Sequence, residues 1–327
     1  MTPEPRRSGA GLPDARLGAS GLTVSKMALG SWRTFEHISR ERGIEVMRAA
    51  REAGVTFLDD ARYNDETGEA PIASGYSEIV FGELFRAAGW RRDDVVVSNK
   101  LWWEFWPEQT AAQELTGSLS RMGLNHVDLI YSETPPDGLP LVEVIGMVTG
   151  LITAGYARAW GTLNWPPSLL ARACEITDRS GVPGPCATQL PYSLVTRDVV
   201  EDPELQRLAA ERDIAIVASY ALAGGVLTGK YAANLAAGRA AGQLDLPRYA
   251  GGARAGRDLA ALAAELGRDP AQLAMAFVLL NKSVTALLFG ATTPEQVHAN
   301  VGALAVAGDL TADEVERLDG IGLSGSG

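Results

Sequence analysis

One pattern recurs along the sequence: a short apolar run, followed by a longer segment with helical periodicity. Eight such runs occur, and they are continuously apolar rather than alternating, as expected for parallel strands covered on both faces. The runs lie at residues 26–32, 55–61, 95–100, 126–133, 157–165, 187–193, 214–221 and 285–291. Eight strand-then-helix units in 327 residues favour a single α/β domain, a (β/α)8 TIM barrel, over a doubly wound sheet with a second domain.

The segments between the runs carry apolar residues three and four positions apart, which predicts amphipathic helices. Most of them run into Gly, a common helix stop. They lie at residues 42–54, 77–89, 107–123, 141–155 and 202–213. Two connections, 63–76 and 231–254, are long and Gly-rich, and we expect them to be loops at the carboxyl end of the barrel, where such folds hold their binding sites.

The ends of the chain and its composition set further expectations. Residues 1–15 are rich in Pro, Gly and charge, which predicts a disordered segment ahead of a barrel domain at 16–327. The sequence has neither the apolar core of a signal peptide nor a membrane-spanning run, so we expect a cytoplasmic protein that does not enter a membrane. The formal charge of -11 argues against nucleic acid as a partner. Cys174 and Cys186 are expected to be reduced and buried.

Polar residues stand where the predicted strands end. Because the carboxyl ends of barrel strands meet at one face, these side chains are expected to converge. Lys100 follows the run "VVVSN" and precedes "LWWEFW", so it is difficult to explain as a solvated surface residue. A buried lysine beside a carboxylate can be a structural ion pair or can tune a neighbouring acid. The candidates are Asp59, Asp60, Lys100, Glu133, Asn164 and Gln189.

Several ordered motifs together resemble the aldo-keto reductases, close to the branch of the voltage-gated channel beta-subunit-like proteins. They include "RLGASGLTVSKMALGSW", "SEIVFGE", "VVVSNK", "SLSRMGLNHVDL", "GTLNW", "TQLPYSL", "VASYALAGGVLTGKY" and "FGATTPEQVHANVGAL". The matches run from about residue 16 to 306, nearly the whole predicted domain. The resemblance implies a barrel that binds NADP(H) at its carboxyl end, uses no metal, and takes a small-molecule substrate.

The resemblance also implies a reaction. In the family, a hydride passes from the nicotinamide to a carbonyl carbon while a Tyr hydroxyl gives a proton to the oxygen, and a Lys and an Asp tune that Tyr. A donor fixed where negative charge develops stabilises the transition state. Asp59 and Lys100 fall on the Asp and Lys positions, and the ammonium is expected to lower the pKa of the Tyr.

The proton donor is offset by one residue. The family Tyr lies five residues after the Asp, whereas "DDARYND" places Tyr63 four residues after Asp59. We favour Tyr63 as the donor, because the long loop that follows can absorb the shortening. Tyr76, Tyr131 and loss of the donor are the alternatives.

Glu133 stands where the family has a His that orients the carbonyl. A protonated Glu133, its pKa raised by burial, would admit reduction of a conjugated C=C or a C=N bond. Otherwise Glu133 forms a salt bridge with Lys100 in a nicotinamide-binding redox sensor with little turnover. The three histidines, His37, His126 and His298, are expected to be structural or solvated.

The remaining assignments concern the cofactor and the substrate. The resemblance assigns Asn164 and Gln189 to the carboxamide, Ser219 and Tyr220 to the nicotinamide ring, and Lys230 to a phosphate. The other cofactor-binding candidates are Leu222, Gly224, Gly290, Thr292, Gln296 and Asn300. An apolar substrate wall, suited to a moderately large apolar or aromatic aldehyde or ketone, is predicted from Trp32, Trp102, Trp103 and Trp106.

Overall fold

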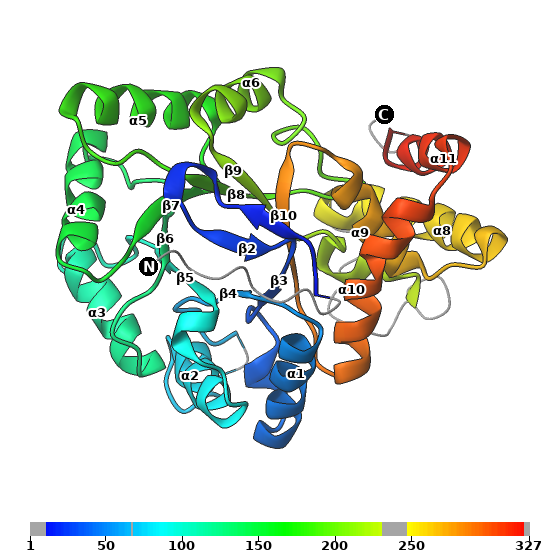
Figure 1. Ribbon diagram of the computed structural model, residues 1–327, viewed down its shortest axis with the longest axis horizontal. Helices are drawn as coiled ribbons and strands as arrows, with labels where there is room; N and C mark the ends of the chain where they lie inside the picture. The colour runs from blue at the N-terminus through cyan, green and yellow to red at the C-terminus, as the bar shows by residue number, and fades with distance from the viewer. Residues whose placement is uncertain (1–10, 67, 231–246, 324–327) are drawn as a thin grey trace, which may run out of the picture.

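A computed structural model of the protein describes residues 11–66, 68–230 and 247–323. Eight parallel strands close into a barrel in the order β10-β3-β4-β5-β6-β7-β8-β9, and helices surround it (Figure 1). The barrel strands are β3 (Met27–Gly30), β4 (Phe57–Asp59), β5 (Val96–Leu101), β6 (Leu129–Ser132), β7 (Ala159–Leu163), β8 (Ala187–Pro191), β9 (Ala215–Ser219) and β10 (Val284–Phe289). The predicted (β/α)8 barrel is confirmed.

Helices form the outer layer of the barrel. They are α1 (Arg40–Glu52), α2 (Tyr76–Ala87), α3 (Ala111–Met122), α4 (Leu141–Thr153), α5 (Pro167–Ser180), α6 (Pro203–Arg212), α8 (Pro247–Leu266), α9 (Pro270–Leu280), α10 (Pro294–Asp309) and α11 (Ala312–Leu323). The start of α3 is fixed by a capping box between Thr110 and Gln113, so this helix begins at Ala111 rather than at residue 107. No helix within the described ranges combines the length and apolarity needed to cross a membrane.

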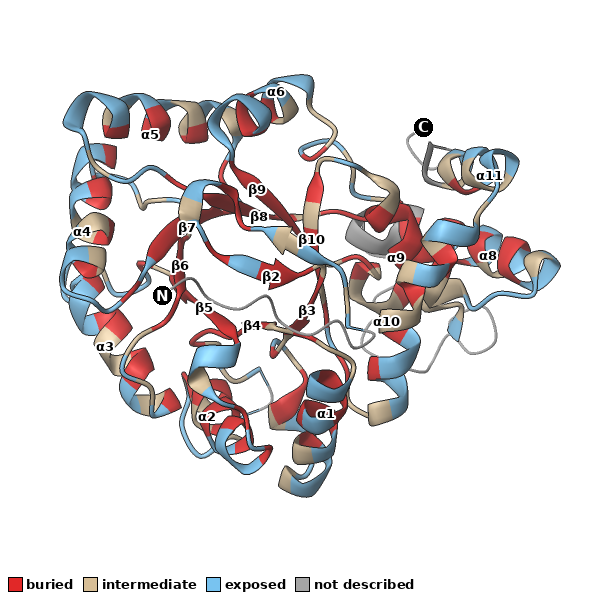
Figure 2. Ribbon diagram, viewed as in Figure 1, coloured by how far each residue is buried: buried red, intermediate tan, exposed pale blue. Residues whose placement is uncertain are grey.

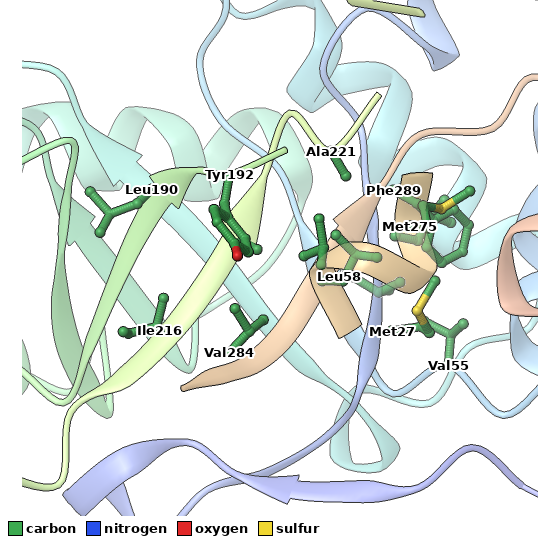
Figure 3. Packing of buried hydrophobic residues seen from close by; sticks show 14 of the residues in the cluster. Met27, Val55, Leu58, Leu190, Tyr192, Ile216, Ala221, Met275, Val284 and Phe289 are labelled. Carbon is green, nitrogen blue, oxygen red and sulfur yellow. The ribbon is translucent and has the colours of Figure 1, made fainter. Parts of the chain in front are cut away.

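The hydrophobic core has two layers, one inside the barrel and one between the barrel and the helices. Figure 2 shows the barrel strands as mostly buried and the helices as buried on one side only. Met27, Leu58 and Ile216 of the barrel belong to the outer layer with Met275 of α9 (Figure 3). Phe57 and Tyr131 belong to the inner layer. Both faces of each strand are therefore covered, as the continuous apolar runs predict. Cys174 and Cys186 are free and buried, as expected.

A hairpin that the sequence patterns do not predict closes the amino-terminal end of the barrel. It consists of β1 (Asp14–Arg16) and β2 (Thr23–Ser25), joined by the short 3-10 helix η1 (Gly18–Ser20), and it lies across the barrel in Figure 1. Leu17, Leu22 and Val24 join the inner core layer. Gly18 has φ +53°, and a Cβ at this position would lie 2.1 Å from the carbonyl oxygen of Cys186. Only glycine fits this close approach.

Two sequence expectations differ from the structure at their boundaries. Strand β1 begins at Asp14, inside the segment 1–15 expected to be disordered, whereas residues 1–10 lie outside the described residues. The second predicted loop, 231–254, is helical from Pro247, where α8 begins, and its part at 231–246 lies outside the described residues. Pro at the first helical position starts a helix, although the glycines that follow it read as loop in the sequence.

Candidate active site

The centre of the site is a buried ion pair between Asp59 and Lys100. Asp59 ends β4, and Lys100 lies one residue before the end of the neighbouring strand β5. The Lys100 Nζ lies 2.6 Å from Asp59 Oδ2, and the two side chains are 3% and 4% exposed. Ser98 Oγ and Gln189 Nε2 donate to Asp59 Oδ1 at 2.6 and 3.3 Å. A buried ion pair needs such additional hydrogen bonds to offset its desolvation.

Tyr63 meets this pair from the loop after β4. Its phenol oxygen lies 3.3 Å from Lys100 Nζ, and the side chain is half-buried. Burial raises the pKa of Tyr63 well above its usual range, and the charge of Asp59 adds to this effect. The net shift is therefore upward, opposite to the lowering that a nearby ammonium alone would produce. The ammonium is already paired with Asp59, so burial and the neighbouring carboxylates determine the direction of the shift.

The two alternative phenols occupy other places. Tyr76 begins α2, and its hydroxyl accepts a hydrogen bond from Arg40 Nη2 at 3.0 Å. Tyr131 is fully buried inside the barrel, on β6. Of the three tyrosines, Tyr63 is the one with a hydrogen bond to Lys100 among the described contacts.

Glu133 follows β6 and is half-buried. Its Oε1 accepts from the backbone N–H of Thr134 at 2.9 Å, and its Oε2 accepts from Asn164 Nδ2 at 3.2 Å. The alternative in which Glu133 pairs with Lys100 is wrong: among the described residues the ion-pair partner of Lys100 is Asp59.

A small pocket, open to solvent, lies beside Tyr63. It is lined by Trp32, Arg33, Glu36, His37, Tyr63, Asn64, Asp65, Glu66, Ala70, Tyr76 and Ser77. Three aromatic rings in this lining supply the apolar surface that small-molecule sites generally have. Of the three histidines, His37 lies in this lining, His126 is half-buried below β6, and His298 is exposed on α10.

The predicted aromatic wall divides into two parts. The Trp102 ring centroid lies 6.0 Å from that of Tyr63, and Trp32 is 41% exposed and faces Tyr220 at 6.4 Å. Trp103, by contrast, is 4% exposed, and its indole N–H donates to Ser132 Oγ at 3.0 Å. Trp106 packs edge-on against Trp103. The placement of Trp103 and Trp106 in the outer core layer is that of packing residues, not of a substrate wall.

The residues assigned to the nicotinamide lie at the ends of β7, β8 and β9. Asn164 is exposed, and its backbone N–H donates to the Gln189 carbonyl at 3.0 Å, whereas the side chain of Asn164 donates to Glu133 and that of the buried Gln189 donates to Asp59. Ser219 ends β9, and Tyr220 follows it with a half-buried ring beside Trp32. Amide groups and an aromatic face are the chemistry that a carboxamide on a flat ring needs.

The residues assigned to the phosphates lie in η4 (Ala223–Thr228) and just after it. Leu222 precedes this segment, and Gly224 and Gly225 have φ values of +68° and +90°. A Cβ on Gly225 would lie 2.8 Å from Lys230 Nζ, so the ammonium folds back onto a turn that glycine keeps open. A cation over such a turn suits a phosphate, and these residues therefore fit a dinucleotide.

The carboxyl-terminal cofactor-binding candidates, Gly290, Thr292, Gln296 and Asn300, shape the turn between β10 and α10. The backbone N–H and the hydroxyl of Thr292 donate to Gln296 Oε1 at 2.8 and 3.1 Å. Asn300 is buried, and its Nδ2 donates to the carbonyl of Gly290 at 3.2 Å. The four residues lie together, and the side chains of Thr292, Gln296 and Asn300 make the hydrogen bonds that hold the turn.

Sequence reasoning missed two residues of the site. Ser98 hydrogen-bonds Asp59, and its signal was its position two residues before Lys100, which places both on one face of β5. Arg62 is 5% exposed beside Tyr63, and its signal was a charged residue inside the "DDARY" strand end.

Comparisons with known proteins agree with this geometry. A family model described as "Aldo/keto reductase family" matches residues 26–322. A probable voltage-gated potassium channel subunit beta of Oryza sativa is 32% identical over 93% of this chain and 95% of its own length. The protein with the same description from Arabidopsis thaliana is 30% identical, over 93% and 94% of the two chains. A putative voltage-gated potassium channel subunit beta of Schizosaccharomyces pombe is also 30% identical, over 95% and 93%.

Proposed function

Because the chain belongs to the aldo/keto reductase family of oxidoreductases, we propose that it reduces the carbonyl group of an apolar or aromatic aldehyde or ketone with NADPH. The observation that carries the proposal is the 3.3 Å contact between the phenol oxygen of Tyr63 and Lys100 Nζ. It joins a hydroxyl in a cavity lining to a buried ammonium, and this combination suits proton delivery to a carbonyl oxygen.

Tyr63 has the protonation state that the proposal requires. Burial and nearby carboxylates raise the pKa of Tyr63, so the phenol keeps its proton at neutral pH and can donate it. As negative charge develops on the substrate oxygen, the phenol proton moves to that oxygen, and Lys100 lies beside the phenolate that remains. Asp59 holds the ammonium in this place.

Bound NADPH would supply the hydride. Asn164 and Gln189 would bind its carboxamide, the Tyr220 ring would cover the nicotinamide, and Lys230 would contact a phosphate. Trp32 and Trp102 would bind the apolar part of the substrate, since both lie near Tyr63 or Tyr220.

A second candidate is a nicotinamide-binding protein with little turnover. The relatives named above are described as potassium channel subunits rather than as enzymes, and Glu133 stands where the family has a His. Reduction of a conjugated C=C or a C=N bond is the remaining alternative, in which Glu133, beside Asn164, would act as the acid.

The test is turnover of NADPH by the purified protein with aromatic aldehydes, quinones, enones and imines. We expect loss of NADPH absorbance with an aromatic aldehyde such as para-nitrobenzaldehyde, and no such loss with Tyr63→Phe although it binds NADPH as tightly. Tight NADPH binding without turnover of any class would support the second candidate. Turnover of enones alone would identify the C=C reaction instead.

A further inference from the structure

Arg62 is a buried cation immediately before Tyr63 in the chain. Its side chain is only 5% exposed. Burying a charge is unfavourable unless the charge is paired and hydrogen-bonded. The partners of Arg62 therefore reveal what this residue holds together.

These partners come from three separate parts of the chain. Nη1 donates to Ser74 Oγ at 2.7 Å, near the end of the loop between β4 and α2, which we call the Tyr63 loop. Nη1 also donates to Glu104 Oε2 at 2.9 Å, in the loop after β5. Nη2 lies 3.5 Å from Oε1 of Glu114 on α3, whose side chain is 4% exposed. The guanidinium also lies 4.9 Å from the Phe105 ring centroid.

The Tyr63 loop is closed around this guanidinium. The backbone N–H of Gly75 donates to the Tyr63 carbonyl at 2.8 Å, and Asn64 and Ser74 form an antiparallel bridge. Asn64 Nδ2 donates to Glu104 Oε1 at 3.0 Å, so Glu104 holds the residues on both sides of Tyr63. The backbone of Tyr63 is thus fixed from its preceding residue, its following residue and the opposite end of the loop.

Glu114 extends the same connection to the aromatic wall. Its Oε1 accepts from the backbone N–H of Trp102 at 2.9 Å, while the carboxylate also pairs with Arg62. The ring of Trp102 lies 6.0 Å from that of Tyr63. One buried carboxylate therefore fixes the chain at Trp102 and the residue next to Tyr63 relative to each other.

From this arrangement we infer that Arg62 is the positioning residue that holds the phenol of Tyr63 at Lys100. This inference rests on the proposed function, in which Tyr63 delivers the proton. Arg62 itself does not touch the reacting atoms; it acts by docking the Tyr63 loop on the loop after β5 and on α3. A misplacement of about 1 Å at a reacting group can lower a rate by about 100-fold.

Arg62→Gln tests the inference against a matched control, Arg197→Gln. Arg197 is also mostly buried, pairs with Glu201 and Asp319 at 2.8 and 2.6 Å, and stacks on Phe277 at 4.8 Å. With para-nitrobenzaldehyde, Arg62→Gln should lose about 10- to 100-fold in kcat, with its Kd for NADPH unchanged. Arg197→Gln should lose a similar amount of thermal stability with kcat unchanged. Equal kcat for the two variants would overturn the inference.

Two further variants apply if Arg62→Gln does not fold. Glu104→Gln neutralises the 41% exposed partner and leaves Arg62 its buried partner Glu114, so it should fold and should also lower kcat. Arg62→Ala should recover activity when millimolar guanidinium is added, because the ion can occupy the vacated place. Failure of both effects would contradict the positioning role.

A readout without turnover separates this inference from the proposed function. Titration of Tyr63, followed by ultraviolet difference absorbance against Tyr63→Phe, should give a lower pKa in Arg62→Gln than in the parent, because the released loop becomes more exposed. A lowered pKa in a protein that reduces no carbonyl would reject the proposed function and retain the loop-docking role. An unchanged pKa together with an unchanged kcat would reject the role of Arg62.

Discussion

The ammonium of Lys100 and the phenol oxygen of Tyr63 lie 3.3 Å apart although the residues are 37 positions apart in the chain. The contact joins a barrel strand to the loop that follows the neighbouring strand. Lys100 is rigid because the barrel wall and Asp59 hold it, whereas Tyr63 depends on the closure of its loop.

Lys100→Met should destabilise the protein by about 3–5 kcal/mol, because Asp59 would remain as a buried carboxylate without its cation. The double variant Lys100→Met, Asp59→Leu should regain most of this stability but remain inactive. Urea unfolding followed by circular dichroism measures both effects. A single variant as stable as the parent would show that the ion pair is dispensable for folding.

Tyr63→Phe should change how stability depends on pH in the alkaline range. The pKa of Tyr63 is raised in the folded protein, so its contribution to stability is fully present below the usual Tyr pKa of about 10 and is lost as pH rises toward the folded value. The parent should therefore lose stability above about pH 10 more steeply than Tyr63→Phe. Thermal unfolding across this range provides the measurement. Parallel curves would contradict the burial of this phenol.

Glu133→Gln should raise the rate of carbonyl reduction by a few-fold to about tenfold, because under the proposed function it replaces an acid at the position where the family has the His that orients the carbonyl. The amide oxygen of the new side chain can still accept a hydrogen bond from Asn164. The comparison is kcat for para-nitrobenzaldehyde, with an enone measured in parallel. A fall in the enone rate alone would instead assign Glu133 the part of an acid.

Gly18→Ala should destabilise the protein by more than about 4 kcal/mol, because its Cβ would overlap backbone atoms ahead of β8 and β9. Gly21→Ala is the matched control: its φ is also positive, at +73°, but nothing lies within 4 Å of the added Cβ. This control should lose only about 1–2 kcal/mol from backbone strain. Equal losses for the two variants would show that the close approach of Gly18 is unimportant.

The barrel and the convergence of its strand-end residues could be predicted because they depend on short-range patterns. Continuous apolar runs identify strands, and the parallel arrangement brings strand ends such as Asp59 and Lys100 to one face. The hairpin β1–β2 could not be predicted, because strands of three residues are too short to show a period.

The direction in which a side chain points beyond a strand end also could not be predicted from the sequence. Trp102 and Trp103 are adjacent in the chain, yet Trp103 has φ +60° and is buried, whereas Trp102 lies beside Tyr63. The direction of the Tyr63 pKa shift could not be predicted either, because it depends on burial and on the prior pairing of Lys100 with Asp59. Such three-dimensional details are decided by loop geometry rather than by residue type.

The hairpin ahead of the barrel contributes core residues that lie outside the family match. The family match starts at residue 26, after the hairpin has ended, and all eight barrel strands lie within the match. A shortened protein that starts at residue 26 would keep every strand but lose Leu17, Leu22 and Val24 from the barrel floor. Solvent would then enter the amino-terminal end of the barrel toward Tyr131 and raise the dielectric constant around the Asp59–Lys100 ion pair. Expression boundaries should therefore be drawn upstream of Asp14.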